Sequence, residues 1–181
     1  MKRIRSSIET KQNVRNISIS ELSTHLYQNR EVVFDLSFPC ALCSCRVYGF
    51  DNFLKNERDF IDKFREIQQL FDDLSGHTLH ELIDDNIFRH CHKVAADKQK
   101  IAKEAIGKLM TQHVGEYASF GMIEQNIDGE ELFQIGTTNA TRLIGTLLGN
   151  VFKILLVDYY HNLHSSSGYN TRTKTTYKFS I

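Results

Sequence analysis

The sequence predicts an α+β fold: an antiparallel β-sheet of about four to five strands with three to four helices packed on one face. One extended segment comes first, helical segments follow, and short apolar segments separated by turn residues fill the C-terminal third. Segregation of helices from most strands along the chain is typical of α+β domains. The length of 181 residues predicts a single domain over residues 1–181, with residues 1–16 and 165–175 expected to be flexible.

The composition indicates a soluble, cytoplasmic protein. No apolar run approaches the roughly 20 residues of a membrane span, and the basic N-terminus lacks the apolar stretch of a signal peptide. Four cysteines in such a chain are expected to be thiols or metal ligands rather than disulfides. The net charge is zero, but residues 1–30 carry +4, residues 51–90 carry −5 and residues 151–181 carry +3. Basic ends permit a phosphate-facing surface, although solvated tails explain them equally simply.

The first half of the chain contains one predicted strand and most of the helices. A short helix is predicted through residues 21–27, and the first main strand over residues 31–38, where strand-forming residues precede a proline. Residues 52–74 have apolar side chains at steps of three and four, which predicts a long amphipathic helix. Thr78 and Glu81 match a capping box and predict a second, short helix. A third helix is predicted over residues 96–113, with a lysine-rich face that is either solvated or directed toward RNA.

The C-terminal part is predicted to be an antiparallel meander. Four strands are expected over residues 117–124, 132–135, 141–148 and 151–158, and a last strand over residues 176–179. The last two strands of the meander are separated by Gly149 and Asn150, which tolerate positive φ and predict a tight hairpin with a buried central strand.

This hairpin places the candidate catalytic residues at one sheet edge. Arg142 begins one strand, while Asp158, Tyr160, His161 and His164 follow the end of the next. A histidine near a carboxylate can act as a general acid or base, and an arginine can stabilise charge on a phosphate. These groups suit a metal-independent ribonuclease. They also suit a plain strand-end turn in which the Asp158 side chain caps backbone donors.

A zinc site is the second candidate. Cys40 and Cys43 have the spacing of one half of a tetrahedral zinc site, and His90 and His92 could supply the other half. Buried thiols at a strand end are the simpler explanation. Two further metal-binding patterns, His161 and His164 with Asp158, and a histidine pair in residues 77–80, match no known signature.

The C-terminal segments also resemble a known family. The succession of Leu132-Phe-Gln-Ile, Arg142-Leu-Ile-Gly and a strand from Gly149 to Asp158 followed by His161 is similar to the C-terminal sheet of RelE/ParE-type bacterial toxins. It also resembles uncharacterised bacterial mobile-element proteins. The resemblance implies a toxin of a toxin–antitoxin pair that cleaves mRNA, often on the ribosome. Arg142 would then hold the scissile phosphate, with acid–base chemistry at His161, Tyr159 or Tyr160.

Three hypotheses about function follow from these observations. The first is an RNA-cleaving or translation-inhibiting toxin that needs no cofactor, whose partners would be RNA or the ribosome and an antitoxin. The second is a non-catalytic phage or plasmid accessory factor that binds a protein partner. The third is a small zinc-stabilised domain. No membrane partner is expected, and exposed sheet edges would allow a homo-oligomer.

Overall fold

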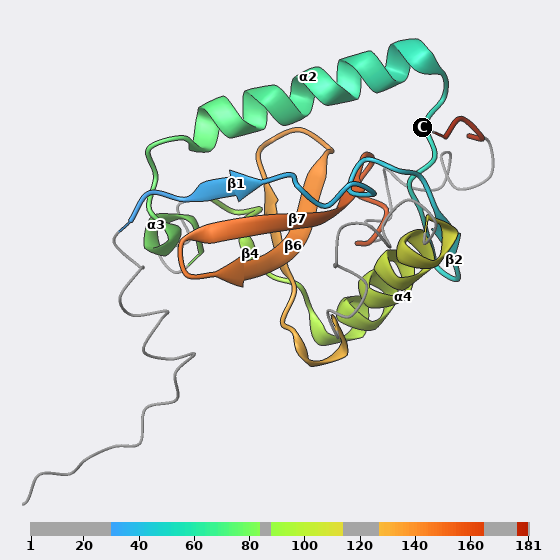
Figure 1. Ribbon diagram of the computed structural model, residues 1–181. Coiled ribbons are helices and arrows are strands. Elements are labelled where there is room, and N and C mark those ends of the chain that lie inside the picture. Colours follow the sequence, from blue (N-terminus) through green and yellow to red (C-terminus); the bar gives the residue numbers. More distant parts are fainter. Residues whose placement is uncertain (1–29, 84–87, 114–126, 165–176, 181) are drawn as a thin grey trace, which may run out of the picture.

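The structure is a computed structural model that describes residues 30–83, 88–113, 127–164 and 177–180. It confirms the α+β class (Figure 1). Its strands are β1 (Val33–Asp35), β2 (Arg46–Val47), β3 (Phe50–Asp51), β4 (His92–Lys93), β5 (Phe133–Gly136), β6 (Arg142–Leu148) and β7 (Val151–Asp158). Its helices are α2 (Glu57–Leu74), α3 (Leu79–Ile83), α4 (Ala96–Gln112) and the 3-10 helix η2 (Ile127–Gly129).

The main sheet has five strands in the order β1-β7-β6-β5-β4. Strands β4 to β7 pair antiparallel, and β1 adds to β7 in parallel, whereas β2 and β3 form a separate hairpin. The predicted β6–β7 hairpin is confirmed, and Gly149 takes the expected positive φ of 62°. Ile154, Leu156 and Val157 are fully buried, so β7 is a buried interior strand as predicted, although β6 rather than β7 is the central strand of the sheet.

A register irregularity divides the long strand β6. It lies between Ile144 and Gly145, where a bulge shifts the pairing with β7. Gly145 approaches the opposite backbone so closely that a Cβ atom there would lie 1.9 Å from the carbonyl oxygen of Lys153. A bulge of this kind re-aims the rest of the strand, here the segment that carries Arg142.

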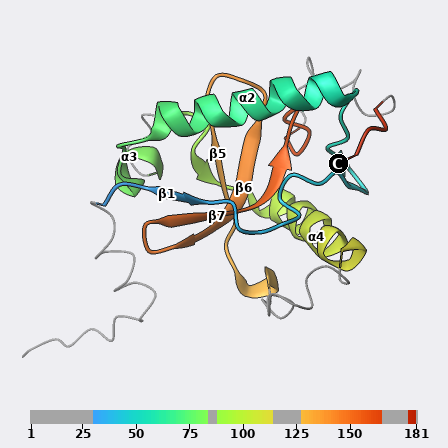
Figure 2. The ribbon, with the colours of Figure 1, turned by 45° about the horizontal axis from the view of Figure 1, so that its top comes forward.

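Helix α2 covers one side of the sheet (Figure 1), and Figure 2 shows it crossing in front of the strands. Ile67, Leu70 and Leu74 of its apolar stripe are buried, and the ring of Phe71 lies 4.9 Å from that of Phe34 on β1. The helix begins at Glu57 rather than at residue 52. The reason is that the side chain of Asn56 accepts a hydrogen bond from the N–H of Asp59 and caps the helix, whereas Leu54 pairs with Phe179.

The two following helices agree with their predictions. The capping box before α3 is present: the N–H of Thr78 donates to Glu81 Oε2 at 2.7 Å, and the N–H of Glu81 donates to Thr78 Oγ1 at 3.3 Å. Helix α4 occupies almost all of the predicted range and buries Ala102, Ala105 and Leu109 against the residues that follow β1 and against β7.

Several predicted elements differ from the structure. The first strand is three residues long rather than eight, because its pairing with β7 ends at Asp35, whose side chain accepts the N–H of Ser37 at 2.8 Å. The predicted last strand is reduced to the single bridge between Leu54 and Phe179. The predicted helix 21–27 and strand 117–124 lie outside the described residues, as do residues 1–16 and 165–175. Within the described part of the chain, no helix has both the length and the apolar character needed to cross a membrane.

Candidate functional site

Asp158 organises the turn that follows β7. Its Oδ1 accepts the N–H groups of Tyr160 at 3.3 Å and Asn162 at 2.8 Å, and its Oδ2 accepts the N–H of Leu163 at 2.8 Å. A short polar side chain that binds backbone donors two to five residues ahead fixes a tight turn. Within that turn His161 takes a φ of 57°, a value that favours glycine. The prediction that Asp158 caps backbone donors is therefore confirmed, and the turn directs His161 and His164 to one place.

Four histidines from two distant segments meet beside this turn; we call them the imidazole cluster: His90, His92, His161 and His164. The His161 ring lies 5.5 Å from that of His164 and 6.5 Å from that of His90, and the His164 ring lies 6.0 Å from that of His92. All four side chains are half-buried, and the Nε2 atom of His164 is fully buried. His90 and His92 arrive through β4, which pairs with β5 at the far edge of the sheet.

Arg142 lies beside the imidazole cluster. In the sheet it stands between Gly136 on β5 and Asp158 on β7, and only 3% of its surface is exposed. Its guanidinium donates to the carbonyl oxygens of Asn139 and, at 2.9 Å, of Thr141. The Nε atom is buried without a hydrogen-bond partner in the described part of the structure. The side chain packs over Gly136, where a Cβ atom would come within 2.5 Å of Arg142 Cδ.

Asp158 and Arg142 are both buried, and each affects the pKa of the other. Complete burial raises the pKa of Asp158 to about 6, although the three N–H donors and the nearby Arg142 act in the opposite direction. Burial lowers the pKa of Arg142, and Asp158 counteracts that effect. Since the ordinary pKa of an arginine is far above neutrality, Arg142 keeps its positive charge beside the four rings.

The pKa values of three imidazoles are lowered in this site, and the charge of Arg142 contributes to each. Burial, then Arg142 and the neighbouring rings, lower the pKa of His161 to about 4. The pKa values of His90 and His164 are lowered by burial first, and Arg142 contributes to both; Lys98 at the start of α4 also lowers that of His164. His90, His161 and His164 are therefore uncharged near neutral pH, mainly because they are buried, and Arg142 adds to this effect. A bound anion would favour their protonated forms by offsetting the charge of Arg142.

A buried amide completes the cluster. Gln134 on β5 is paired with His92, and its Nε2 atom lies 3.3 Å from His92 Nε2 and 3.4 Å from the carbonyl oxygen of His90. Its Oε1 atom is buried without a hydrogen-bond partner among the described residues. Gln134 was not a predicted site residue; the signal in the sequence is a glutamine within an otherwise apolar strand.

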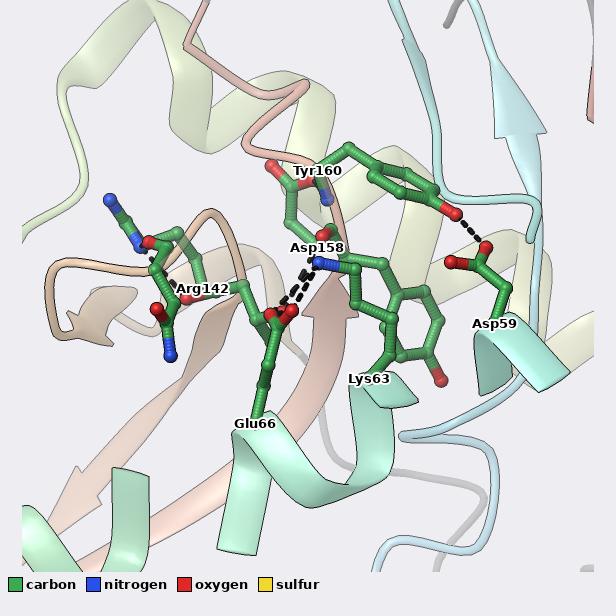
Figure 3. Close-up of polar contacts among 9 residues, drawn as sticks. Asp59, Lys63, Glu66, Arg142, Asp158 and Tyr160 are labelled. Atoms are coloured by element: carbon green, nitrogen blue, oxygen red, sulfur yellow. Dashed lines mark hydrogen bonds and ion pairs between the residues drawn. The ribbon is translucent and has the colours of Figure 1, made fainter. Parts of the chain in front are cut away.

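Tyr160 points toward Asp59 on α2 (Figure 3). Its hydroxyl donates to Asp59, and the ammonium of Lys63 lies 5.1 Å from its ring centroid. Lys63 is itself buried and bonds both carboxylate oxygens of Glu66 at 2.8 Å. Burial, then Asp59, raises the pKa of Tyr160 well above its ordinary value, so this phenol is a poor acid–base group. Tyr160 is placed to anchor the turn rather than to react.

Glu66 connects α2 to the strand of Arg142. The Oγ1 atom of Thr141 donates to Glu66 Oε2 at 2.5 Å, one residue before Arg142. Side chains of α2 thus bind one side chain on each side of the site: Thr141, just before β6, and Tyr160, after β7.

The four residues of the predicted zinc set are placed with different partners. The thiol of Cys40 is buried and lies 3.7 Å from the carbonyl oxygen of Leu109 on α4, whereas His90 and His92 belong to the imidazole cluster. Cys43 is half-buried in the segment between β1 and β2. Among the described residues no three histidine, cysteine, aspartate or glutamate side chains are arranged to hold a metal ion. The structure therefore brings neither Cys40 nor Cys43 to the two histidines.

Comparisons with known proteins identify a family. The family model described as "Uncharacterised protein UU032" matches residues 37–181. The chain belongs to this family. It is 20% identical over 178 residues to an uncharacterised protein UU032 of Ureaplasma parvum serovar 3 (strain ATCC 700970), a match that covers 98% of this chain and 92% of that protein. No solved structure matches the chain.

This family membership corrects the resemblance drawn from the sequence. The assignment to RelE/ParE-type toxins is wrong, because the matching family is that of UU032 instead. The short segments that suggested it, an arginine that begins one strand and a histidine after the next, are features that any β-hairpin with polar ends can share.

Proposed function

We propose that this protein is an endoribonuclease that needs no metal ion. The observation that carries the proposal is the imidazole cluster beside the buried Arg142: neutral proton acceptors and a fixed positive charge in one half-buried place. Cleavage of a phosphodiester requires a base, an acid and a stabilised anion, and these groups supply all three. This proposal does not depend on any toxin family.

The reaction would use the 2′-hydroxyl of RNA as its nucleophile. Neutral His161 takes the proton of that hydroxyl, whose oxygen forms a bond to phosphorus while the bond to the 5′-oxygen breaks. His164, the ring at 5.5 Å, donates a proton to the leaving oxygen once the bound phosphate has raised its pKa. The products are a 2′,3′-cyclic phosphate and a 5′-hydroxyl. The positive charge of Arg142 beside the rings stabilises the phosphorane.

The test is cleavage of a defined single-stranded RNA by the purified protein in the presence of EDTA. We expect cyclic-phosphate products from the wild type, and a loss of roughly a hundredfold or more in His161→Asn, within the range for removal of one general base. His80→Asn, an exposed histidine on α3, is the matched control and should retain full activity. Absence of cleavage by a folded wild type, or equal cleavage by wild type and His161→Asn, would contradict the proposal.

A second candidate function, binding of a protein partner without catalysis, is favoured by the opposite end of the sheet. Val33 on β1 and Leu148 on β6 are 51% and 79% exposed, and both are paired with Val151. Neighbouring exposed apolar side chains are typical of interaction surfaces. A pulldown in which Leu148→Lys releases a partner that His161→Asn retains would support this function.

A further inference from the structure

A second surface with its own chemistry lies at the β2–β3 hairpin. The hairpin turns through Tyr48 and Gly49, and Gly49 takes the positive φ of 83° that the turn requires. Tyr48 is 93% exposed, so its ring contributes almost nothing to the core. The guanidinium of Arg46, on the same hairpin, lies 5.1 Å from the ring centroid of Phe53. Tyr48 and Arg46 therefore place an aromatic ring and a cation at the surface of the same hairpin.

The C-terminal segment extends this surface. Phe179 exchanges two backbone hydrogen bonds of 3.1 Å with Leu54, and Figure 1 shows this end of the chain close to the start of α2. The segment thereby places Tyr177 5.4 Å from the ring of Tyr160. The ammonium of Lys55 lies 5.3 Å from the Tyr177 ring and 5.8 Å from the Tyr160 ring.

Further contacts make the surface continuous. Arg46 donates to the carbonyl oxygen of Tyr177 at 3.4 Å, and Lys108 on α4 donates to that of Arg46 at 2.7 Å. We call the whole set the aromatic–basic surface: Arg46, Tyr48, Phe53, Lys55, Lys108 and Tyr177. Tyr160 contacts Lys55 and Tyr177 of this surface, and His161 of the imidazole cluster is the next residue in the chain.

Two acidic side chains that contact this surface, Asp51 and Asp59, already have partners within the protein. Asp51 is buried and lies 3.7 Å from Arg46 Nε, and Asp59 accepts hydrogen bonds from the Tyr160 hydroxyl and from the N–H of Lys55. Arg46, Lys55 and Lys108 are all exposed, so three cationic side chains reach the outward face. Cations alternating with aromatic rings suit a polyanion whose bases can stack, because every nucleobase offers a π-face.

We propose that the aromatic–basic surface binds single-stranded RNA. Tyr48 and Tyr177 stack bases, and Arg46, Lys55 and Lys108 contact the phosphates on either side. One part of the inference rests on the proposed function, namely the path of the RNA. The bound RNA would pass Tyr160 and reach His161 and the imidazole cluster. Duplex RNA does not fit this mode of binding, since its bases are not free to stack on tyrosines.

The test separates binding from cleavage by using a fluorescein-labelled oligouridylate in the His161→Asn background, followed by fluorescence anisotropy. We expect Tyr48→Ala to weaken binding roughly tenfold, in line with the loss of one stacked base, and Lys55→Gln to reduce the salt dependence by about one released counterion. Lys100→Gln on the exposed side of α4 is the matched control and should bind as the parent does. A duplex of the same length should compete poorly.

Binding that is unchanged in both Tyr48→Ala and Lys55→Gln would overturn the inference, as would equal affinity for the duplex. Because Tyr48 is almost fully exposed, its replacement leaves the fold intact, and circular dichroism verifies this for each variant. If the wild type binds the oligouridylate through Tyr48 but never cleaves it, the proposed nuclease function fails while this inference stands. If the wild type cleaves RNA and the Tyr48→Ala variant cleaves and binds it equally well, this inference fails while the proposed nuclease function stands.

Discussion

Arg142 and Gly136 are tied together by a steric requirement. The arginine crosses β5 where the absence of a Cβ atom leaves room for it, and this route is what brings its charge beside the imidazole rings. A larger residue at position 136 would leave Arg142 present but displaced. Position 136 is therefore where the placement of the charge can be tested without removing the charge itself.

We expect Gly136→Ala to reduce RNA cleavage by roughly tenfold to a hundredfold, because a small misplacement of a catalytic charge has effects of that size. The unfolding free energy should fall by about 1–3 kcal/mol, as for other overpacked sites. Cleavage assays and urea unfolding measure the two effects. The control is Gly107→Ala on α4, where a Cβ atom meets nothing within 4 Å and the helix should be stabilised. A Gly136→Ala protein with wild-type activity would show that the position of Arg142 is unimportant.

The sequence grouped four of the seven residues that meet at the site. Arg142, Asp158, His161 and His164 could be grouped because one hairpin with a readable turn sets their register. His90 and His92 were identified as metal-binding candidates but were paired with cysteines, because nothing local reveals that β4 joins β5 across some 40 residues. Two-residue strands carry no periodicity, so a long-range pairing of this kind is specified only by tertiary packing.

At the scale of helices and strands, the sequence predicted the features that depend only on residues close together in the chain. The capping box, the amphipathic stripe of α2 and the β6–β7 turn each depend on residues within a few positions of one another, and all three are present. The parallel pairing of β1 with β7 was missed, because parallel strands need a long connection and show no turn signal. The bulge at Gly145 was missed for a similar reason: it depends on the backbone of the partner strand.

The capping box gives a prediction about α3. Thr78→Ala removes the side-chain acceptor of the Glu81 N–H, so we expect a loss of about 1 kcal/mol in unfolding free energy. Thr111→Ala is the control: its hydroxyl donates within α4 to the carbonyl of Gly107, and an exposed helical threonine replaced by alanine should be neutral or slightly stabilising. Urea denaturation of the two variants measures the difference. Equal stability of Thr78→Ala and wild type would mean that α3 does not need its cap.

The bulge gives a stronger prediction. A Cβ atom at Gly145 would lie 1.9 Å from a backbone oxygen, which no side-chain movement can relieve. We expect Gly145→Ala to lose more than about 4 kcal/mol, enough to leave a marginally stable domain largely unfolded. Thermal unfolding followed by circular dichroism is the measurement. A cooperative transition near the wild-type temperature would contradict the observed β6–β7 register.

For the molecule as a whole, the site sets how stability depends on pH. The pKa of Asp158 is raised to about 6, so its contribution is present at low pH and is lost as the pH rises through that value. The pKa of His161 is lowered to about 4, and those of His90 and His164 are lowered as well, so their contributions are present above the ordinary histidine pKa and are lost as the pH falls. Three imidazoles therefore make the folded state more stable as the pH rises, and one carboxyl group makes it less stable.

We therefore expect the melting temperature to rise between about pH 5 and pH 7, the interval in which unfolded histidines bind protons that the folded ones do not. His161→Asn should flatten this rise, because it removes the imidazole with the largest resolved shift, whereas the exposed His80→Asn should leave the slope unchanged. Saturating inorganic phosphate should also flatten it, since an anion bound among the rings favours their protonated forms and stabilises the folded state most at the lower pH. A melting temperature that falls from pH 5 to pH 7, or a slope that phosphate and His161→Asn both leave intact, would mean that His90, His161 and His164 are not held neutral by their surroundings.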